Sequence, residues 1–169
     1  MAPGGHGGGG GGVVILAVTL TRAPLLVPLT ALQGNLVAHF ADRPGARWRA
    51  LLGPAAVVLA VGMLGVLAAA TLGPWLLRVA FGAQYQTSGV LLAWLTAGAV
   101  SVALLTVTGF AAVAAAAHRA YALGWVGATV AAALVLSLPM ELQTRTVLAL
   151  LCGPIVGVAV HLTALSRAG

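Results

Sequence analysis

Residues 89–117 read GVLLAWLTAGAVSVALLTVTGFAAVAAAA, and this run contains no charged side chain. A helix needs about 20 consecutive apolar residues to cross the hydrocarbon core of a bilayer, so this stretch is long enough to span a membrane with some tilt. Other apolar stretches lie on both sides of it. We therefore predict an all-α membrane protein of about five transmembrane helices, which cover residues 13–40, 51–72, 89–117, 121–138 and 146–165.

The composition agrees with this class. Hydrophobic residues make up 61% of the chain and charged residues only 6%, whereas soluble domains carry about a quarter charged residues. The connections between the predicted helices are too short for a soluble domain, and residues 1–12, MAPGGHGGGGGG, are predicted to form a flexible Gly-rich tail. The single cysteine, Cys152, lies inside an apolar run and is expected to pack between helices.

The net charge of +6 comes from arginines that are scattered singly between apolar runs. This distribution indicates topology signals and contacts with membrane lipids, and it argues against nucleic-acid binding. With five helices, one side of the membrane carries Arg43, Arg47, Arg49, Arg119 and Arg167, and the other carries Arg78 and Arg145 beside Glu141. The positive-inside rule then predicts an outside N-terminus and a cytoplasmic C-terminus. Pro74 and Trp75 begin the predicted connection after residue 72 and have the character of an interfacial anchor.

The sequence offers no catalytic constellation, so we do not expect an enzyme, a catalytic residue or a cofactor. Asp42 and Glu141 are the only carboxylates, and they fall in connections on opposite sides of the membrane, where they cannot act as an acid–base pair. Nucleotide-binding and nucleophile motifs are missing. The histidines, which are His6, His39, His118 and His161, lack metal-ligand spacing, so no metal site is predicted. The last three fall near cytoplasmic ends of the predicted helices, where an interfacial role is expected.

Arg22 is the exception among the charged residues because it lies about ten residues into the first apolar segment. An arginine at that depth costs about 2.5–3.5 kcal/mol and normally faces a cavity or a partner. At 100° per residue Arg22 and Gln33 share one helix face, with Thr19 and Thr30 close to it. One interpretation is that these four residues line a hydrophilic cavity and bind an anionic group. The alternative is that Arg22 snorkels to lipid headgroups, aided by a kink at Pro24.

Two further patterns concern the later helices. Gly153 and Gly157 form a GxxxG pattern, which is typical of closely packed membrane helices. Hydroxyl side chains also recur along residues 89–117, and these are Thr96, Ser101, Thr106 and Thr108. Such hydroxyls usually bond to a carbonyl of their own helix, and a substrate-facing role is the alternative.

The order of these features resembles a known family. The segment TRAPLLVPLTALQG (residues 21–34) precedes a short basic loop, and GPWLLRVAFGAQY (residues 73–85) precedes the long apolar helix that ends at His118 and Arg119. This order is similar to that in bacterial polysaccharide or O-antigen flippases of the multidrug/oligosaccharidyl-lipid/polysaccharide exporter superfamily. The resemblance implies the last five helices of a transporter with twelve or more, whose substrate is a polyprenyl-pyrophosphate-linked oligosaccharide of the cell envelope.

The resemblance also implies a place and partners for the chain. It implies a multi-pass protein of the bacterial inner (plasma) membrane that works with missing N-terminal helices or a partner subunit. A membrane scaffold or assembly subunit without transport activity remains an alternative, as does a multidrug exporter fragment. The exporter fragment is less favoured, because that branch uses intramembrane carboxylates and the predicted helices contain none.

Overall fold

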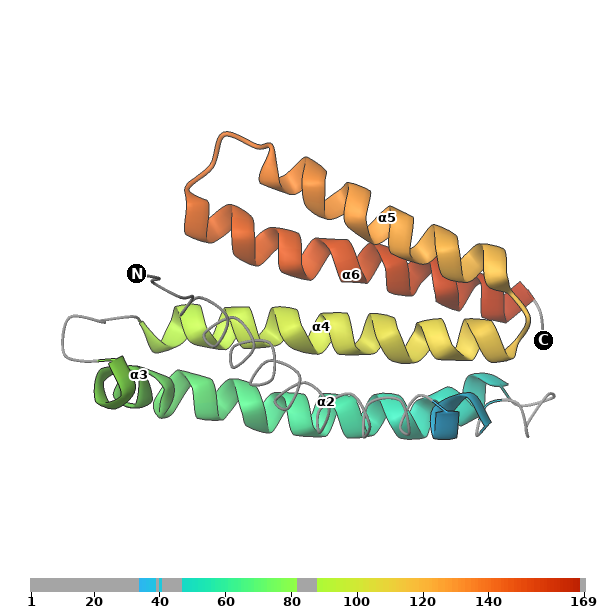
Figure 1. Cartoon of the computed structure of the whole chain (residues 1–169), viewed down its shortest axis with the longest axis horizontal. Helices are drawn as coiled ribbons and strands as arrows, with labels where there is room; N and C mark the ends of the chain where they lie inside the picture. Colours follow the sequence, from blue (N-terminus) through green and yellow to red (C-terminus); the bar gives the residue numbers. More distant parts are fainter. Residues whose placement is uncertain (1–33, 39, 41–46, 82–87, 168–169) are drawn as a thin grey trace, which may run out of the picture. The chain divides into compact units, whose positions relative to one another are not determined.

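The structure, a computed structural model, describes residues 34–38, 40, 47–81 and 88–167 (Figure 1). The chain divides into two units, Met1–Leu36 and Val37–Gly169. Apart from residues 34–36, the described residues belong to the second unit.

Helices make up the second unit where it is described. In chain order they are α2 (Arg47–Thr71), α3 (Gly73–Phe81), α4 (Gly89–Ala114), α5 (His118–Leu136) and α6 (Leu142–Arg167). Four of them are long and apolar enough to cross a membrane, and these candidate spans are Arg49–Thr71, Gly89–Ala114, His118–Leu136 and Leu142–Arg167. The prediction of an all-α protein is confirmed for the described residues, and these four helices have the length and apolar composition that the predicted spans require. The predicted span at residues 13–40 falls almost entirely outside the described residues.

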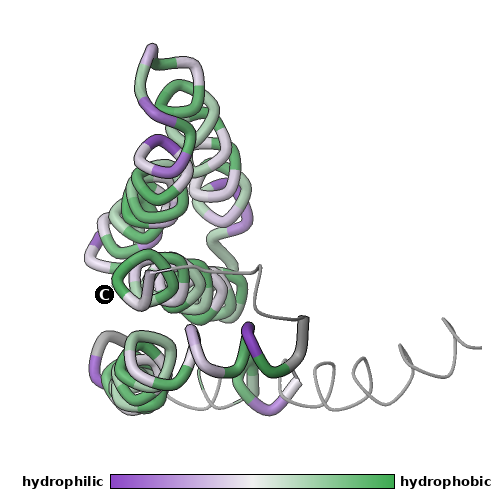
Figure 2. Tube along the Cα trace, turned by 90° about the vertical axis from the view of Figure 1, so that its left-hand side faces the viewer, coloured by the Kyte–Doolittle hydropathy of each residue, from purple (hydrophilic) through white to green (hydrophobic). Residues whose placement is uncertain are grey.

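The four long helices form a row in which each runs opposite to the next along the chain. α2 packs on α4, α4 packs on α6, and α6 packs on α5 (Figure 1). Seen from the end, the helices are hydrophobic around most of their circumference (Figure 2). The row has two ends along the helix axes. One of them holds the start of α2, the end of α4, the start of α5 and the end of α6.

Glycines allow neighbouring helices in the row to approach closely. A Cβ atom added to Gly62 of α2 would lie 2.5 Å from Cγ2 of Val100 on α4, and one on Gly98 of α4 would lie 2.8 Å from Cβ of Leu150 on α6. Side chains of ordinary size would hold these helices apart at both places. Close backbone approach is the main source of packing energy in a lipid environment, where no hydrophobic effect drives helices together.

α4 and α5 are joined by a turn of three alanines. The N–H of Ala116 donates to the carbonyl of Val113 (2.9 Å), and the N–H of Ala117 donates to that of Ala112 (2.9 Å). This pair of bonds is a Schellman motif, which requires a left-handed residue after the helix. Ala116 takes that conformation with φ 56°, although glycine is the residue that adopts it without strain.

The connection between α2 and α4 differs from the sequence prediction because it contains the helix α3. Pro74 has no N–H and cannot bond to the carbonyl of Ala70, so the helix breaks there. The free side of that carbonyl is met by Gly89, where an added Cβ would collide with the Ala70 oxygen. The absence of a side chain at Gly89 therefore lets the first turn of α4 sit against the end of α2.

Candidate functional site

The residues predicted to line a cavity, Thr19, Arg22, Thr30 and Gln33, lie outside the described part of the chain. Their shared face and their role therefore stay predictions. Within the described helices the most distinctive polar group is instead His161 of α6, whose side chain is completely buried. The sequence predicts an interfacial role for His161, but its side chain is buried between helices.

His161 belongs to a stripe of buried residues that recur every four positions along α6. The members of this stripe are Ala149, Gly153, Gly157, His161 and Leu165. Residues four apart lie one above another on the same helix face, so the GxxxG pattern leads directly to the histidine. The stripe brings α6 so close to α5 that a Cβ on Gly157 would lie 2.6 Å from the carbonyl oxygen of Gly124. The prediction that Gly153 and Gly157 serve helix packing is confirmed.

The imidazole of His161 connects three helices. Its Nδ1 lies 3.0 Å from Oγ1 of Thr108 on α4, and its Nε2 lies 3.3 Å from the carbonyl oxygen of Tyr121 on α5. Because a carbonyl oxygen only accepts, the second contact requires a hydrogen on Nε2. In a neutral histidine Nδ1 is then an acceptor, and the hydroxyl of Thr108 is the group that donates to it.

Thr108 has a single hydroxyl hydrogen and three acceptors within reach. Besides Nδ1 of His161, the carbonyl oxygens of Leu104 and Leu105 each lie 3.0 Å from its Oγ1. Donation to Nδ1 satisfies both ring nitrogens of His161, whereas donation to either carbonyl leaves Nδ1 without a hydrogen to accept. The buried ring thus has a complete set of partners only when it bonds to both neighbouring helices.

Glycines form the slot that receives the ring. A Cβ on Gly124 of α5 would lie 2.5 Å from Cδ2 and 2.8 Å from Cε1 of His161, and closer still to Nε2. On α4, a Cβ at Gly109 would lie 3.4 Å from Cε1 of the same ring. The ring of Tyr121 stacks on the imidazole with an interplanar angle of 3° and a centroid distance of 6.2 Å. The slot therefore fits an imidazole in one orientation.

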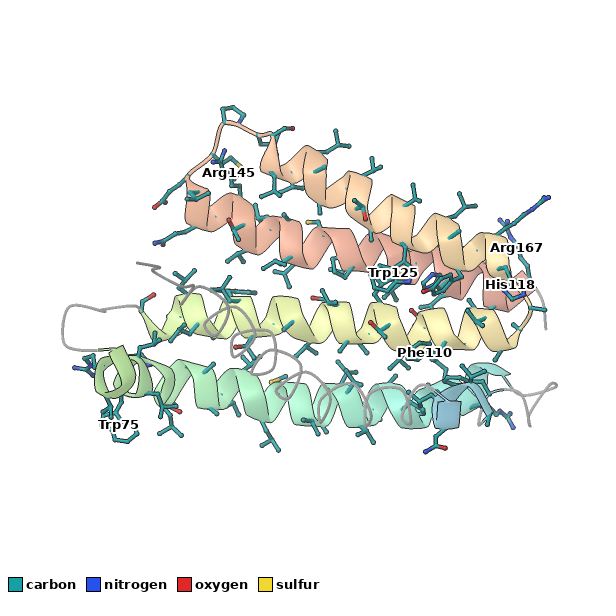
Figure 3. The ribbon with its side chains drawn as sticks, viewed as in Figure 1. Trp75, Phe110, His118, Trp125, Arg145 and Arg167 are labelled. Atoms are coloured by element: carbon teal, nitrogen blue, oxygen red, sulfur yellow. The ribbon has the colours of Figure 1, made fainter. Side chains whose placement is uncertain are left out.

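An aromatic neighbour extends this cluster along α5. Trp125 lies one turn after Tyr121, and the two rings meet edge to face with centroids 6.4 Å apart. The indole Nε1 of Trp125 is buried and has no hydrogen-bond partner among the described atoms. In Figure 3, Trp125 extends from α5 into the space beside α4 and α6. The cluster lies between α4 and the α5–α6 pair, near the end of the row that holds the start of α5 and the end of α6.

The contacts of this cluster join α4, α5 and α6. Within the described residues the only carboxylate is Glu141, which is exposed at the opposite end of α6. The same residues hold no group of three or more histidine, cysteine or acidic side chains that could bind a metal ion. The cluster links three helices through the hydrogen bonds of His161, and its described residues include no acid–base pair.

The hydroxyls of α4 bond as expected to their own helix. Oγ1 of Thr96 donates to the carbonyl of Leu92 (2.8 Å), and Oγ1 of Thr106 donates to that of Val102 (2.9 Å). Oγ of Ser101 donates to the carbonyl of Ala97 (2.9 Å). Among these four hydroxyls, that of Thr108 reaches a side chain of another helix, the imidazole of His161. The substrate-facing alternative gains no support from this pattern.

The arginine and histidine side chains labelled in Figure 3 lie at the two ends of the row. His118 and Arg167 lie at one end, with the exposed Arg49 and Arg119 on helix turns of that end, and Arg145 lies at the other (Figure 3). This distribution is the one expected for helices whose middle portions face hydrocarbon. The prediction for Cys152 is wrong: its side chain is exposed, because it lies one position before Gly153 and so points away from the buried stripe.

Comparison with known proteins finds relatives in mycobacteria. The chain is 68% identical over 153 residues to uncharacterized protein Rv3630 of Mycobacterium tuberculosis, a match that covers 90% of this chain and 36% of the relative. It is 69% identical over 153 residues to uncharacterized protein Rv1510 of the same organism, covering 90% of this chain and 35% of that protein. The chain thus spans about a third of the length of these relatives. No protein-family model and no solved structure matches the chain.

Proposed function

We propose that the chain is part of a flippase-like transporter in the bacterial plasma membrane, with its N-terminus outside and its C-terminus in the cytoplasm. Its substrate is a polyprenyl-pyrophosphate-linked oligosaccharide, which moves from the inner to the outer leaflet during biosynthesis of cell-surface polysaccharide. The resemblance in the order of sequence features suggests this substrate class. The proposal stands on that resemblance and on the architecture of the described helices.

The open row of helices is the observation that best supports the proposal that this chain is part of a larger transporter. α2 and α5, the two outermost helices of the row, keep large apolar side chains exposed, such as Leu64 (69% exposed) and Leu134 (63%). A single row encloses no path through the membrane, so transport requires further helices or a partner subunit. The relatives are about three times as long as the part that they share with this chain, and their remaining length can supply such helices.

In this proposal Arg22 binds the pyrophosphate of the substrate within a water-accessible cavity. A guanidinium binds phosphate oxygens through two parallel hydrogen bonds, which the point charge of a lysine cannot reproduce. The test uses the intact protein in vesicles with a labelled lipid-linked oligosaccharide. We expect Arg22→Ala to abolish flipping without loss of membrane insertion, and Arg22→Lys to restore it only in part. Flipping by Arg22→Ala at the wild-type rate would contradict the proposal, and full activity of Arg22→Lys would favour snorkelling.

A scaffold or assembly subunit is the second candidate, and one observation favours it. The α4 hydroxyls that could have lined a polar path bond to carbonyls of their own helix, and Thr108 turns towards His161. A scaffold needs no charged group in a cavity. A cysteine placed at position 22 separates the candidates, because a transporter lets water-soluble maleimides reach it, whereas a scaffold protects it from both sides of the membrane.

A further inference from the structure

The helix α3 begins where α2 has already crossed the hydrocarbon core. The candidate span of α2, Arg49–Thr71, has 23 residues, which at 1.5 Å per residue cover about 35 Å, more than the roughly 30 Å of the core. α3 follows after one residue, and α4 re-enters the same core at Gly89. In Figure 1 α3 is seen nearly end-on while α2 is seen from the side, so α3 runs across the end of α2.

One face of α3 carries large apolar side chains that are exposed. They are Leu72 (55% exposed), Trp75 (56%), Leu76 (53%) and Val79 (66%). Leu72 belongs to the same turn, because its carbonyl accepts from the N–H of Leu76 (2.9 Å). These positions follow the i, i+3, i+4, i+7 pattern of a single apolar stripe. Pro74 and Leu77 lie on the other side of α3 and are half-buried against the protein.

A cationic side chain borders the apolar stripe. Arg78 is exposed, and its Nε donates to the carbonyl oxygen of Pro74 (3.2 Å), which holds the guanidinium along the edge of the helix. Tryptophan is enriched at membrane–water interfaces, and arginine binds the phosphates of lipid headgroups. In Figure 3 Trp75 extends from α3 on the side away from α4.

We propose that α3 lies in the plane of the membrane, within the interfacial layer of the leaflet at that end of the row. Leu72, Trp75, Leu76 and Val79 insert among the upper acyl chains, and Arg78 contacts lipid phosphates. The occupant of the exposed stripe is lipid because the stripe continues directly from a helix that crosses the bilayer, and because its aromatic and cationic members match the two layers of the interface. α3 thereby fixes the depth of α2 and α4 in the bilayer.

The test measures the depth of α3 in vesicles of three parts phosphatidylcholine to one part phosphatidylglycerol. Nitroxide labels are attached to Leu76→Cys and Val79→Cys in a Cys152→Ala background. Leu64→Cys, on an exposed position within α2, is the reference for hydrocarbon, and Glu141→Cys, in the exposed α5–α6 connection, is the reference for water. Collisions with oxygen report hydrocarbon, and collisions with a water-soluble nickel chelate report water.

We expect the oxygen-to-nickel collision ratio at positions 76 and 79 to lie between the two references and several-fold above that at 141. A ratio equal to that at 141 would overturn the proposal, since α3 would then stand in water. Protection from both colliders would also overturn it, because a protein segment would then cover the stripe. Quenching of Trp75 by brominated lipids, with Trp48, Trp94 and Trp125 changed to phenylalanine, is an independent measurement that leaves the α3 side chains intact.

Discussion

Replacing Gly124 by alanine tests whether the slot around His161 controls the packing of α5 on α6. The added Cβ would lie 2.5 Å and 2.8 Å from two carbon atoms of the imidazole, which is itself held by bonds to Thr108 and Tyr121. Overpacking of this kind costs about 1–3 kcal/mol, and the higher helix propensity of alanine returns about 0.5–1 kcal/mol. We therefore expect Gly124→Ala to be less stable by about 1 kcal/mol, and by no more than about 2.5 kcal/mol.

Gly127 of the same helix provides the matched control. A Cβ at that position would meet its nearest atom, Cγ1 of Val156, at 3.7 Å, which is an ordinary contact. Gly127→Ala should therefore be neutral or more stable by up to about 1 kcal/mol. The free energy of unfolding is measured for both variants in mixed micelles, by titration with a denaturing detergent and near-UV circular dichroism.

A double-mutant cycle identifies the origin of the cost. When His161→Ala removes the ring, the space beside Gly124 is open and the penalty of Gly124→Ala should disappear, with a coupling energy of about the same size as the penalty. Equal stabilities of Gly124→Ala and Gly127→Ala would refute this reasoning. Persistence of the penalty in the His161→Ala background would show that another group causes it.

Three other predictions follow from single features. Thr108→Val should be less stable by about 1 kcal/mol because Nδ1 of His161 loses its donor. Thr106→Val, in which the lost hydroxyl bonds to the Val102 carbonyl of its own helix, should stay within about 0.5 kcal/mol of wild type in the same detergent titration. Equal losses for the two variants would contradict this. Ala116→Gly should raise stability by about 1 kcal/mol because it relieves the left-handed alanine, and Ala122→Gly on the exposed face of α5 should lower it. Alkaline phosphatase fused after Gly169 should be inactive in bacterial cells and active when inserted within residues 84–88; the reverse pattern would invert the proposed topology.

The sequence predicts the existence and number of the later long helices because their apolar runs exceed the length needed to cross a bilayer. The ends are less well defined: α6 begins at Leu142, four residues before the predicted start, since polar residues such as Arg145 are tolerated in a first turn. α3 was expected to be a connection because nine residues are too few to span a membrane and begin with a helix-breaking Gly-Pro pair.

The environment of His161 could not be predicted from its distance to the end of the helix. It lies six residues, about 9 Å along the axis, before Arg167, which suggested the membrane interface. The decisive signal is its face, because four-residue steps from Gly153 and Gly157 place it on the packing side. Its partners Thr108 and Tyr121 belong to helices whose pairing no local pattern specifies. The same steps show why Cys152 is exposed, as it is one residue out of phase.

The three-alanine turn between α4 and α5 has a consequence for how the protein is made. Because only three residues join them, α4 and α5 form a hairpin whose two helices are both synthesised before α6. Yet α5 packs mainly on α6, which follows it in the chain and is synthesised after it. During that interval the contacts of Gly124 with His161 and Gly157 have not yet formed. The synthesis of α6, which brings Gly157 and His161, is what converts the α4–α5 hairpin into a packed set of helices.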